Sequence, residues 1–291
     1  MKRIAVFGAA GQLGTELCAE FSRRGYQVRG GGRSDWDVAH AARVEQALAE
    51  FGPAVVLNAA AYNLVDVAEK EPVEAFQVNA LAVRNLAIAC RNAGAKLVHF
   101  STDYVFDGLA GRAYREEDEP HPLGAYAVSK LAGELYARAY LDDPLIIRTC
   151  GVFGPAGAWT PRGNFVETML RLAAKGDLIK VIDFVASPTF APALASRTAD
   201  LVERGAEGVY HLGGGSPISW FDWAAKIFNA AGLNPPLQPT NDREFRPPAR
   251  RPKYSALSNA KAERLGIAPM PSLDDAIRSY LESRNARTRT A

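Results

Sequence analysis

The chain has 291 residues, of which 48% are hydrophobic and 23% are charged, which is an ordinary globular composition. Its net charge of +2 is too small to predict binding to nucleic acid or to an anionic membrane, and no apolar run reaches the roughly 20 residues of a spanning helix. Cys18, Cys90 and Cys150 lack metal-site spacing, as do the four histidines. We therefore expect reduced thiols, no bound metal and a cytoplasmic location.

Short apolar runs and longer amphipathic stretches alternate through the first 150 residues. The apolar runs, which we expect to be strands, are residues 4–7, 55–57, 97–100 and 145–147, with another strand near 26–30. The stretch 73–93 has the apolar spacing of a helix. This alternation predicts an α/β fold, with a Rossmann-type, doubly wound parallel sheet in a domain over residues 1–150.

After about residue 150 the alternation is less regular. Residues 151–163 are rich in Gly, Pro and Ala and predict a loop, and residues 235–252 predict a basic, proline-rich crossing with little regular structure. Helices are expected at 164–174, 193–203 and 273–281, strands at 178–182 and 209–212, and a frayed end at 285–291. We expect residues 151–291 to form mainly a smaller substrate-binding lobe, with some late elements returning to the sheet.

A glycine-rich turn, with glycines at 8, 11 and 14, follows the first strand and opens a helix. Glycines let the backbone approach a diphosphate closely, and the positive end of a helix favours its charge. In this strand–turn–helix context the motif predicts a dinucleotide site. The turn after the second strand contains Arg33, and an arginine there suits the 2′-phosphate of NADP. The expected cofactor is therefore NADP(H) or NAD(H), with NADP(H) favoured; the alternative for Arg33 is a solvated surface residue.

Tyr126 and Lys130 are four residues apart in a helical stretch, so they share one face of the helix. A lysine ammonium near the phenol lowers the tyrosine pKa and makes it a usable general acid. Thr102 ends the strand before this helix, where a hydroxyl points toward the ligand cleft of an open α/β sheet. These three residues predict carbonyl reduction by hydride transfer.

Taken together, these motifs resemble the extended short-chain dehydrogenase/reductases that act on nucleotide sugars, and most closely the dTDP-4-dehydrorhamnose reductases. Residues 58–62, 76–80, 101–108 and 126–134 carry the resemblance in the first half, and the segment Ser-Thr-Asp-Tyr-Val-Phe-Asp-Gly at 101–108 is specific to that family. Shorter matches at 148–149, 164–165, 188–189, 210–212 and 251–255 extend it over nearly the whole chain.

The resemblance implies NAD(P)H-dependent reduction of a 4-keto-6-deoxy sugar on dTDP, in L-rhamnose or related deoxysugar synthesis, with Tyr126 protonating the oxygen. It implies Thr102, Tyr126 and Lys130 as the catalytic set and a nucleotide sugar as partner, and it is compatible with a homodimer. Tyr126 and Lys130 would also contact the cofactor. The other implied cofactor contacts are Gly8, Gly11, Gln12, Leu13, Gly14, Asp37, Val38, Ala59, Ala60 and Ala61, and the implied substrate contacts are Asp103, Tyr104, Asn164 and Arg251.

Two departures from the family pattern fall in the substrate half. Gly151 stands where the family carries a tryptophan beside the sugar, and Phe184 stands where it carries a polar amide. One interpretation is drift, with Phe184 filling the volume of the tryptophan; the other is a different sugar or no turnover. Two other functions therefore stay open: an epimerase or dehydratase of the same fold, and a non-catalytic, cofactor-binding regulatory subunit.

Overall fold

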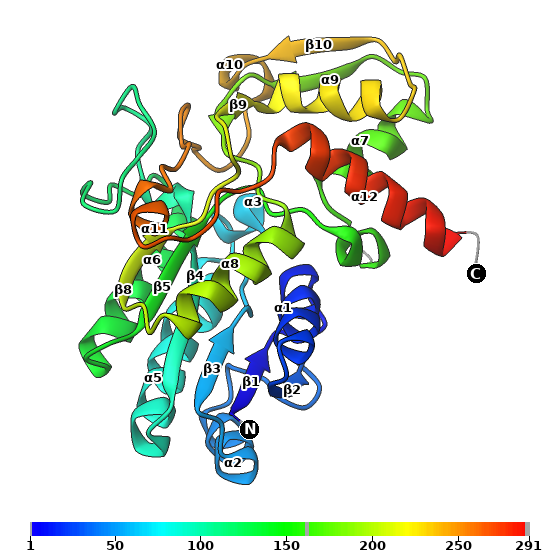
Figure 1. Cartoon of the computed structure of the whole chain (residues 1–291). Coiled ribbons are helices and arrows are strands. Elements are labelled where there is room, and N and C mark those ends of the chain that lie inside the picture. The colour runs from blue at the N-terminus through cyan, green and yellow to red at the C-terminus, as the bar shows by residue number, and fades with distance from the viewer. Residues whose placement is uncertain (1, 161–162, 289–291) are drawn as a thin grey trace.

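The computed structural model describes residues 2–160 and 163–288 and contains a parallel sheet of six strands (Figure 1). The strand order is β2-β1-β3-β4-β5-β8. The bounds are β1 Arg3–Phe7, β2 Gln27–Gly31, β3 Val55–Asn58, β4 Lys96–Thr102, β5 Leu145–Thr149 and β8 Gly208–His211. The predicted Rossmann-type parallel sheet is confirmed, and the late strand β8 pairs with β5 at its edge.

Helices cover both faces of this sheet because successive strand residues point to opposite sides. In β1, Ile4 and Val6 pack in one core, and Ala5 and Phe7 pack in the other. The first face carries α1 (Gln12–Arg23), α8 (Ala191–Glu203) and α11 (Ala260–Arg264). The second face carries α2 (Ala41–Phe51), α5 (Ala82–Ala93) and α6 (Ala125–Tyr140). The sheet is thus sealed on both sides, which leaves the carboxyl ends of its strands as the place for a ligand.

The segment between β3 and β4 differs from the single amphipathic helix expected at 73–93. It contains α3 (Val65–Ala68), α4 (Pro72–Phe76), a π-helical turn η1 (Gln77–Leu81) and α5. The expectation was wrong at the middle turn, where Asn79 is only 1% exposed and bonds outside the helix. A short 3-10 turn, η2 (Asp103–Val105), follows β4.

The second lobe stands above the carboxyl ends of the strands (Figure 1). Its elements are η3 Pro155–Trp159, α7 Phe165–Ala173, β6 Ile179–Ile182, β7 Val185–Ala186, β9 Ile218–Ser219, α9 Trp220–Ala230, β10 Leu237–Thr240, α10 Asp242–Phe245 and α12 Leu273–Thr288. Trp223, Phe153 and Tyr280 lie in its core. This core is separate from the two cores on the faces of the sheet, and a smaller cluster joins Ala186 of β7 to Val105 and Cys150, which follow β4 and β5.

The structure corrects three expectations about this lobe. The proline-rich crossing contains β10 and α10, because β10 pairs in parallel with β6 and its Pro239 is tolerated in a two-stranded sheet. The loop at 151–163 contains η3. The last helix continues to Thr288 instead of fraying from 285, because Tyr280 and Arg284 are anchored to Glu167 at 2.8 and 2.7 Å; the rest of the expected frayed end, residues 289–291, lies outside the described residues.

No helix in the described residues combines the length and apolar character needed to cross a membrane.

Candidate functional site

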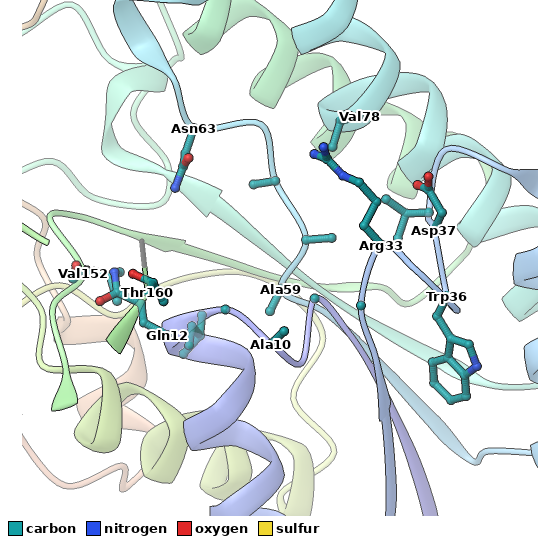
Figure 2. Close-up of a pocket in the computed structure, with 17 residues that line it drawn as sticks. Ala10, Gln12, Arg33, Trp36, Asp37, Ala59, Asn63, Val78, Val152 and Thr160 are labelled. Atoms are coloured by element: carbon teal, nitrogen blue, oxygen red, sulfur yellow. Dashed lines mark hydrogen bonds between the residues drawn. The ribbon is translucent and has the colours of Figure 1, made fainter. Parts of the chain in front are cut away.

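A cavity of about 810 Å³ lies at the carboxyl ends of β1, β2 and β3 (Figure 2). Ligand pockets for molecules of drug or cofactor size span roughly 300–1,000 Å³. Ten residues predicted to bind the cofactor line it, namely Gly8, Gly11, Gln12, Leu13, Arg33, Asp37, Val38, Ala59, Ala60 and Ala61. The structure therefore brings the predicted diphosphate, ribose and adenine segments together in one cavity.

The glycine turn is required by close backbone packing. Gly8 has a φ of +76°, and a Cβ there would lie 2.6 Å from the backbone nitrogen of Ala60. Gly14 lies behind the cavity wall: a Cβ on it would overlap the Gly8 carbonyl oxygen. The first turn of α1, which begins at Gln12, points its N–H groups toward the cavity end of the helix. A diphosphate fits this cradle.

The turn after β2 forms the other end of the cavity. Figure 2 shows the exposed side chain of Arg33 extended toward Val78, with Asp37 and Trp36 beside it. One Asp37 carboxylate oxygen accepts a hydrogen bond from the N–H of Ala39 at 3.0 Å. Both a cation and a carboxylate thus stand at the end where the adenosine ribose is expected.

The three predicted catalytic residues meet above β4. Thr102 is the last residue of β4, Tyr126 lies in the first turn of α6, and Lys130 follows one turn later. The Thr102 hydroxyl hydrogen-bonds Tyr126, accepts from the N–H of Tyr104 at 3.2 Å, and donates to Asp103 at 3.1 Å. The buried Lys130 Nζ donates to the carbonyl of Phe100 at 2.6 Å. None of the three lines the 810 Å³ cavity itself.

The expectation that Lys130 lowers the pKa of Tyr126 is not met in this structure. Burial raises the pKa of Tyr126 to about 12, although its hydrogen bond with Thr102 acts in the opposite direction. Burial also lowers the pKa of Lys130 to about 8, although the nearby Glu134 carboxylate acts in the opposite direction and raises this pKa. Tyr126 is therefore a protonated phenol at neutral pH, as a proton donor must be.

The predicted substrate residue Asp103 is only 2% exposed. It accepts hydrogen bonds from the Ser255 hydroxyl at 2.5 Å and from Thr102 and Cys150. Burial raises the pKa of Asp103 to about 6. Its carboxyl group joins a buried cluster behind Thr102 that links the two lobes.

Tyr104 and Arg251 lie nearer the space between the lobes. The Tyr104 ring meets the Tyr126 ring edge-on with a centroid distance of 6.0 Å, and Arg251 hydrogen-bonds Tyr104. Arg251 also forms a two-pronged ion pair with Asp66 at 2.9 and 2.8 Å. It lines a second cavity of about 410 Å³. The other lining residues of that cavity are Asp107, Gly108, Leu109, Leu123, Phe184, Asp242, Arg243, Pro247, Ala249, Arg250 and Lys253.

Asn164, another predicted substrate residue, caps α7. Its Oδ1 accepts from the N–H of Glu167 at 3.1 Å, and its Nδ2 is 3.3 Å from the Gly154 carbonyl and 3.5 Å from Gln12 Oε1. Asn164 thus ties α7 to Gln12, which lines the large cavity.

At the first departure from the family pattern, Gly151 has a φ of +48°. A Cβ there would lie 3.6 Å from the Trp220 ring and 3.7 Å from the Trp223 ring. The two tryptophans pack against each other, and Trp223 is fully buried, as expected for core residues. Two tryptophans of α9 therefore lie beside Gly151.

Sequence reasoning missed several residues of the large cavity. They are Ala10, Gly32, Trp36, Asn63, Val78, Val152 and Thr160. Ala10 and Gly32 lie in the two turns after β1 and β2 that the sequence already marks, so including every residue of those turns would have found them. Val152 and Thr160 arrive from the second lobe, and no local pattern marks them. The described residues hold no group of three or more His, Cys, Asp or Glu side chains suited to a metal ion.

Comparisons with known proteins agree with this geometry. Residues 1–285 match the family described as RmlD substrate binding domain. The chain is 36% identical over 287 residues to the spore coat polysaccharide biosynthesis protein SpsK of Bacillus subtilis, covering 98% of this chain and 99% of the relative. It is 39% identical over 276 residues to a dTDP-4-dehydrorhamnose reductase of Streptomyces griseus, covering 92% and 89%.

A solved structure gives the same result. The dTDP-4-dehydrorhamnose reductase of Bacillus anthracis, in complex with NADP, superposes with a TM-score of 0.91 at 34% identity, covering 97% of this chain and 99% of that one. The family match over nearly the full chain, the relatives above 30% identity and the shared fold lead to one conclusion. This chain belongs to the RmlD substrate binding domain family.

Proposed function

We propose that the protein reduces the 4-keto group of a nucleotide-linked 6-deoxy sugar, with NADPH as the preferred reductant, as a dTDP-4-dehydrorhamnose reductase does. The supporting observation is the cavity of about 810 Å³ with its glycine cradle and Arg33, together with the Thr102–Tyr126–Lys130 cluster one strand away. The relatives named dTDP-4-dehydrorhamnose reductase support the substrate class.

When bound, the reduced nicotinamide supplies the hydride. Tyr126 holds the proton that the sugar oxygen receives, because burial keeps its phenol protonated. Lys130, with a pKa of about 8, is largely cationic at neutral pH; its Nζ is held by the Phe100 carbonyl, and its part is to contact the bound cofactor. Thr102 orients the Tyr126 hydroxyl through their hydrogen bond.

We further propose that the second cavity receives the diphosphate of the substrate. Its wall carries four cationic side chains, Arg243, Arg250, Arg251 and Lys253, against Asp107 and Asp242. Arginine forks suit phosphate oxygens. Arg251 connects this cavity to the reaction centre through Tyr104, whose ring contacts Tyr126. Residues 151–291 then act mainly as the substrate lobe.

Loss of NADPH absorbance with dTDP-4-keto-6-deoxy-L-mannose tests this function. Tyr126→Phe should lower kcat by at least ~100-fold, since a positioned general acid contributes that much. The matched control is Tyr136→Phe, on the same helix, where the ring packs against Tyr140 and activity should be retained. Wild-type protein that binds NADPH but reduces no keto sugar would contradict the proposal and favour a regulatory subunit.

We also propose a cytoplasmic homodimer. Val73, Leu81, Val128 and Leu135 are exposed on α4, η1 and α6, which pack side by side, and such a patch suits a second copy of the chain. The free cysteines Cys18, Cys90 and Cys150 fit a reducing compartment. Sedimentation of wild type and Leu135→Lys tests the assembly: the wild type should sediment as a dimer and the variant as a monomer. A wild-type monomer would contradict the proposal.

A further inference from the structure

One wall of the large cavity belongs to the second lobe. Val152 and Thr160 line the cavity from that lobe, whereas its other lining residues come from the turns after β1, β2 and β3 and from η1. Figure 2 shows Val152 and Thr160 beside Gln12, the first residue of α1. The Gln12 Nε2 donates to the carbonyl of Val152 at 2.8 Å. Gln12 therefore lines the cavity and also binds the lobe that completes its wall.

Four polar side chains of the second lobe follow one another behind Gln12. The Nδ2 of Asn164 lies 3.5 Å from Gln12 Oε1 and 3.3 Å from the hydroxyl of Tyr280. That hydroxyl donates to Glu167 at 2.8 Å, and Arg284 donates to the same carboxylate oxygen at 2.7 Å. We call Gln12, Asn164, Glu167, Tyr280 and Arg284 the interlobe cluster. It connects the last helix, α12, to the cofactor cavity.

The burial of this cluster is poorly explained by the stability of the lobe. Tyr280 is fully buried, and Asn164 and Glu167 are 9% and 8% exposed, beside a core of aromatic and aliphatic side chains. Apolar side chains there would avoid the cost of taking an amide and a carboxylate out of water. A bonded polar network in a protein interior instead holds its members in one arrangement. The cluster therefore suits a positioning role.

Gly157 of η3 shows how closely the two amides of the cluster approach. A Cβ at this glycine would overlap Gln12 Oε1 and lie 2.6 Å from Asn164 Nδ2. Both atoms are the far ends of flexible side chains, and the described glycines with positive φ do not include Gly157. Alanine at 157 would therefore displace the two amides and leave the backbone in place.

We propose that Asn164 and Tyr280 are positioning residues that fix Gln12 and, with it, the second-lobe wall of the cofactor cavity. Their contacts hold the Gln12 amide where it reaches the carbonyl of Val152. The start of α1, which faces the expected diphosphate, and the wall beside it are thereby set together. Because α12 supplies Tyr280, the end of the chain takes part in cofactor binding. This inference concerns the cofactor and is independent of which sugar is reduced.

The test measures NADPH Kd by fluorescence titration, and melting temperature, on the full chain. Gly157→Ala places a methyl group between Gln12 and Asn164. Tyr280→Phe removes the hydroxyl and keeps the ring. A double variant combines the two changes, so that their effects on NADPH binding can be compared with the product of the single effects.

Two control variants match these changes outside the cluster. Ala156→Ser adds one atom to the position next to Gly157 in η3. Tyr140→Phe removes a hydroxyl that accepts from Arg84, on residues that do not line the cavity. Both controls should bind NADPH within about twofold of wild type, since neither touches Gln12.

Gly157→Ala should weaken NADPH binding by at least ~10-fold, and Tyr280→Phe by at least ~3-fold, which are the factors expected for losing one hydrogen bond. The double variant should lose little more than Gly157→Ala alone, because both changes act through the same contact with Gln12. A general weakening of the fold would instead lower the melting temperature and make the two losses multiply.

Wild-type NADPH affinity in either single variant, or losses that multiply in the double variant, would overturn the proposal. If Gly157→Ala or the double variant does not fold, the affinity of Tyr280→Phe decides alone. A wild type that turns over no keto sugar would contradict the proposed function and leave this test of cofactor binding unchanged.

Discussion

The two cavities differ in how the chain builds their walls. The large cavity takes most of its lining from three short consecutive segments, which follow β1, β2 and β3. The smaller cavity takes its lining from residues 107–109, 123, 184 and 242–253, which belong to no single motif. The first wall is set by local backbone rules, and the second by tertiary contacts between lobes. Variants at the two sites should therefore behave differently.

Gly14→Ala should have the largest effect, because the local rule is strictest there. The added Cβ would overlap the backbone oxygen of Gly8, which has no side chain to move aside. A strain of ~3 kcal/mol corresponds to about a 100-fold loss of NADPH affinity. Fluorescence titration measures this, with Ala19→Ser on the exposed side of α1 as the control. Wild-type affinity in Gly14→Ala would mean that the turn is not the cofactor cradle.

The sequence was sufficient for this part of the molecule. The glycines of the turn directly follow an apolar strand, and Arg33 follows the next strand in the chain, so this order and spacing alone predict a sheet with a dinucleotide site. Gly14 differs from the other glycines of the turn, because it does not line the cavity and instead packs against the backbone of Gly8 behind the cavity wall. A spacing pattern does not distinguish a glycine that touches a ligand from one that permits close packing.

Arg33→Ala should have a smaller and selective effect. The guanidinium extends from the cavity rim (Figure 2), so its loss should weaken NADPH by ~10-fold or more through a lost charge-assisted bond. NADH, which lacks the 2′-phosphate, should bind within about twofold of wild type. Titration with both cofactors measures the difference. Arg43→Ala is the control, since Arg43 donates to the Ser34 carbonyl on the same turn and does not line the cavity. Equal losses for NADPH and NADH would remove Arg33 from the 2′-phosphate role.

The surroundings of the predicted substrate residues were beyond prediction from the sequence. Asp103 was expected to face the sugar, but it is buried against Ser255, which lies 152 positions away in the chain. Asn164 bonds to Gly154 and Tyr280, and Trp220 approaches Gly151. The π-turn around Asn79 was read as plain helix for the same reason: its side-chain partners, Tyr62 and Ser129, come from other elements. Such contacts depend on how the lobes and helices pack, which periodicity does not encode.

Asp103→Asn should have the smallest effect and the most specific pH dependence. The pKa of Asp103 is raised by burial from 3.8 to about 6, so ionisation costs folding stability as pH rises through about 6 and costs none below 3.8. The pKa shift limits the gain in the free energy of unfolding of Asp103→Asn to ~3 kcal/mol. We expect a net gain of only ~1 kcal/mol at pH 7.5, because the hydroxyl of Ser255 must rotate to form a hydrogen bond with the asparagine amide. The variant should melt ~2–4 °C above wild type at pH 7.5, and the difference should shrink as pH falls through about 6 and reverse toward pH 4, where Asp103 is protonated and only the cost of the amide remains.

Asp107→Asn provides a control of opposite sign. The N–H of Leu109 and the hydroxyl of Tyr114 hold the pKa of Asp107 below its usual value, so this carboxylate stabilises the fold at every pH above about 4. Its variant should melt below wild type by an amount that does not change between pH 5 and 7.5. A pH-independent difference for Asp103→Asn as well would mean that Asp103 is ionised throughout. The junction behind Thr102 would then hold a permanent charge, and substrate binding rather than folding would have to explain why the chain buries it there.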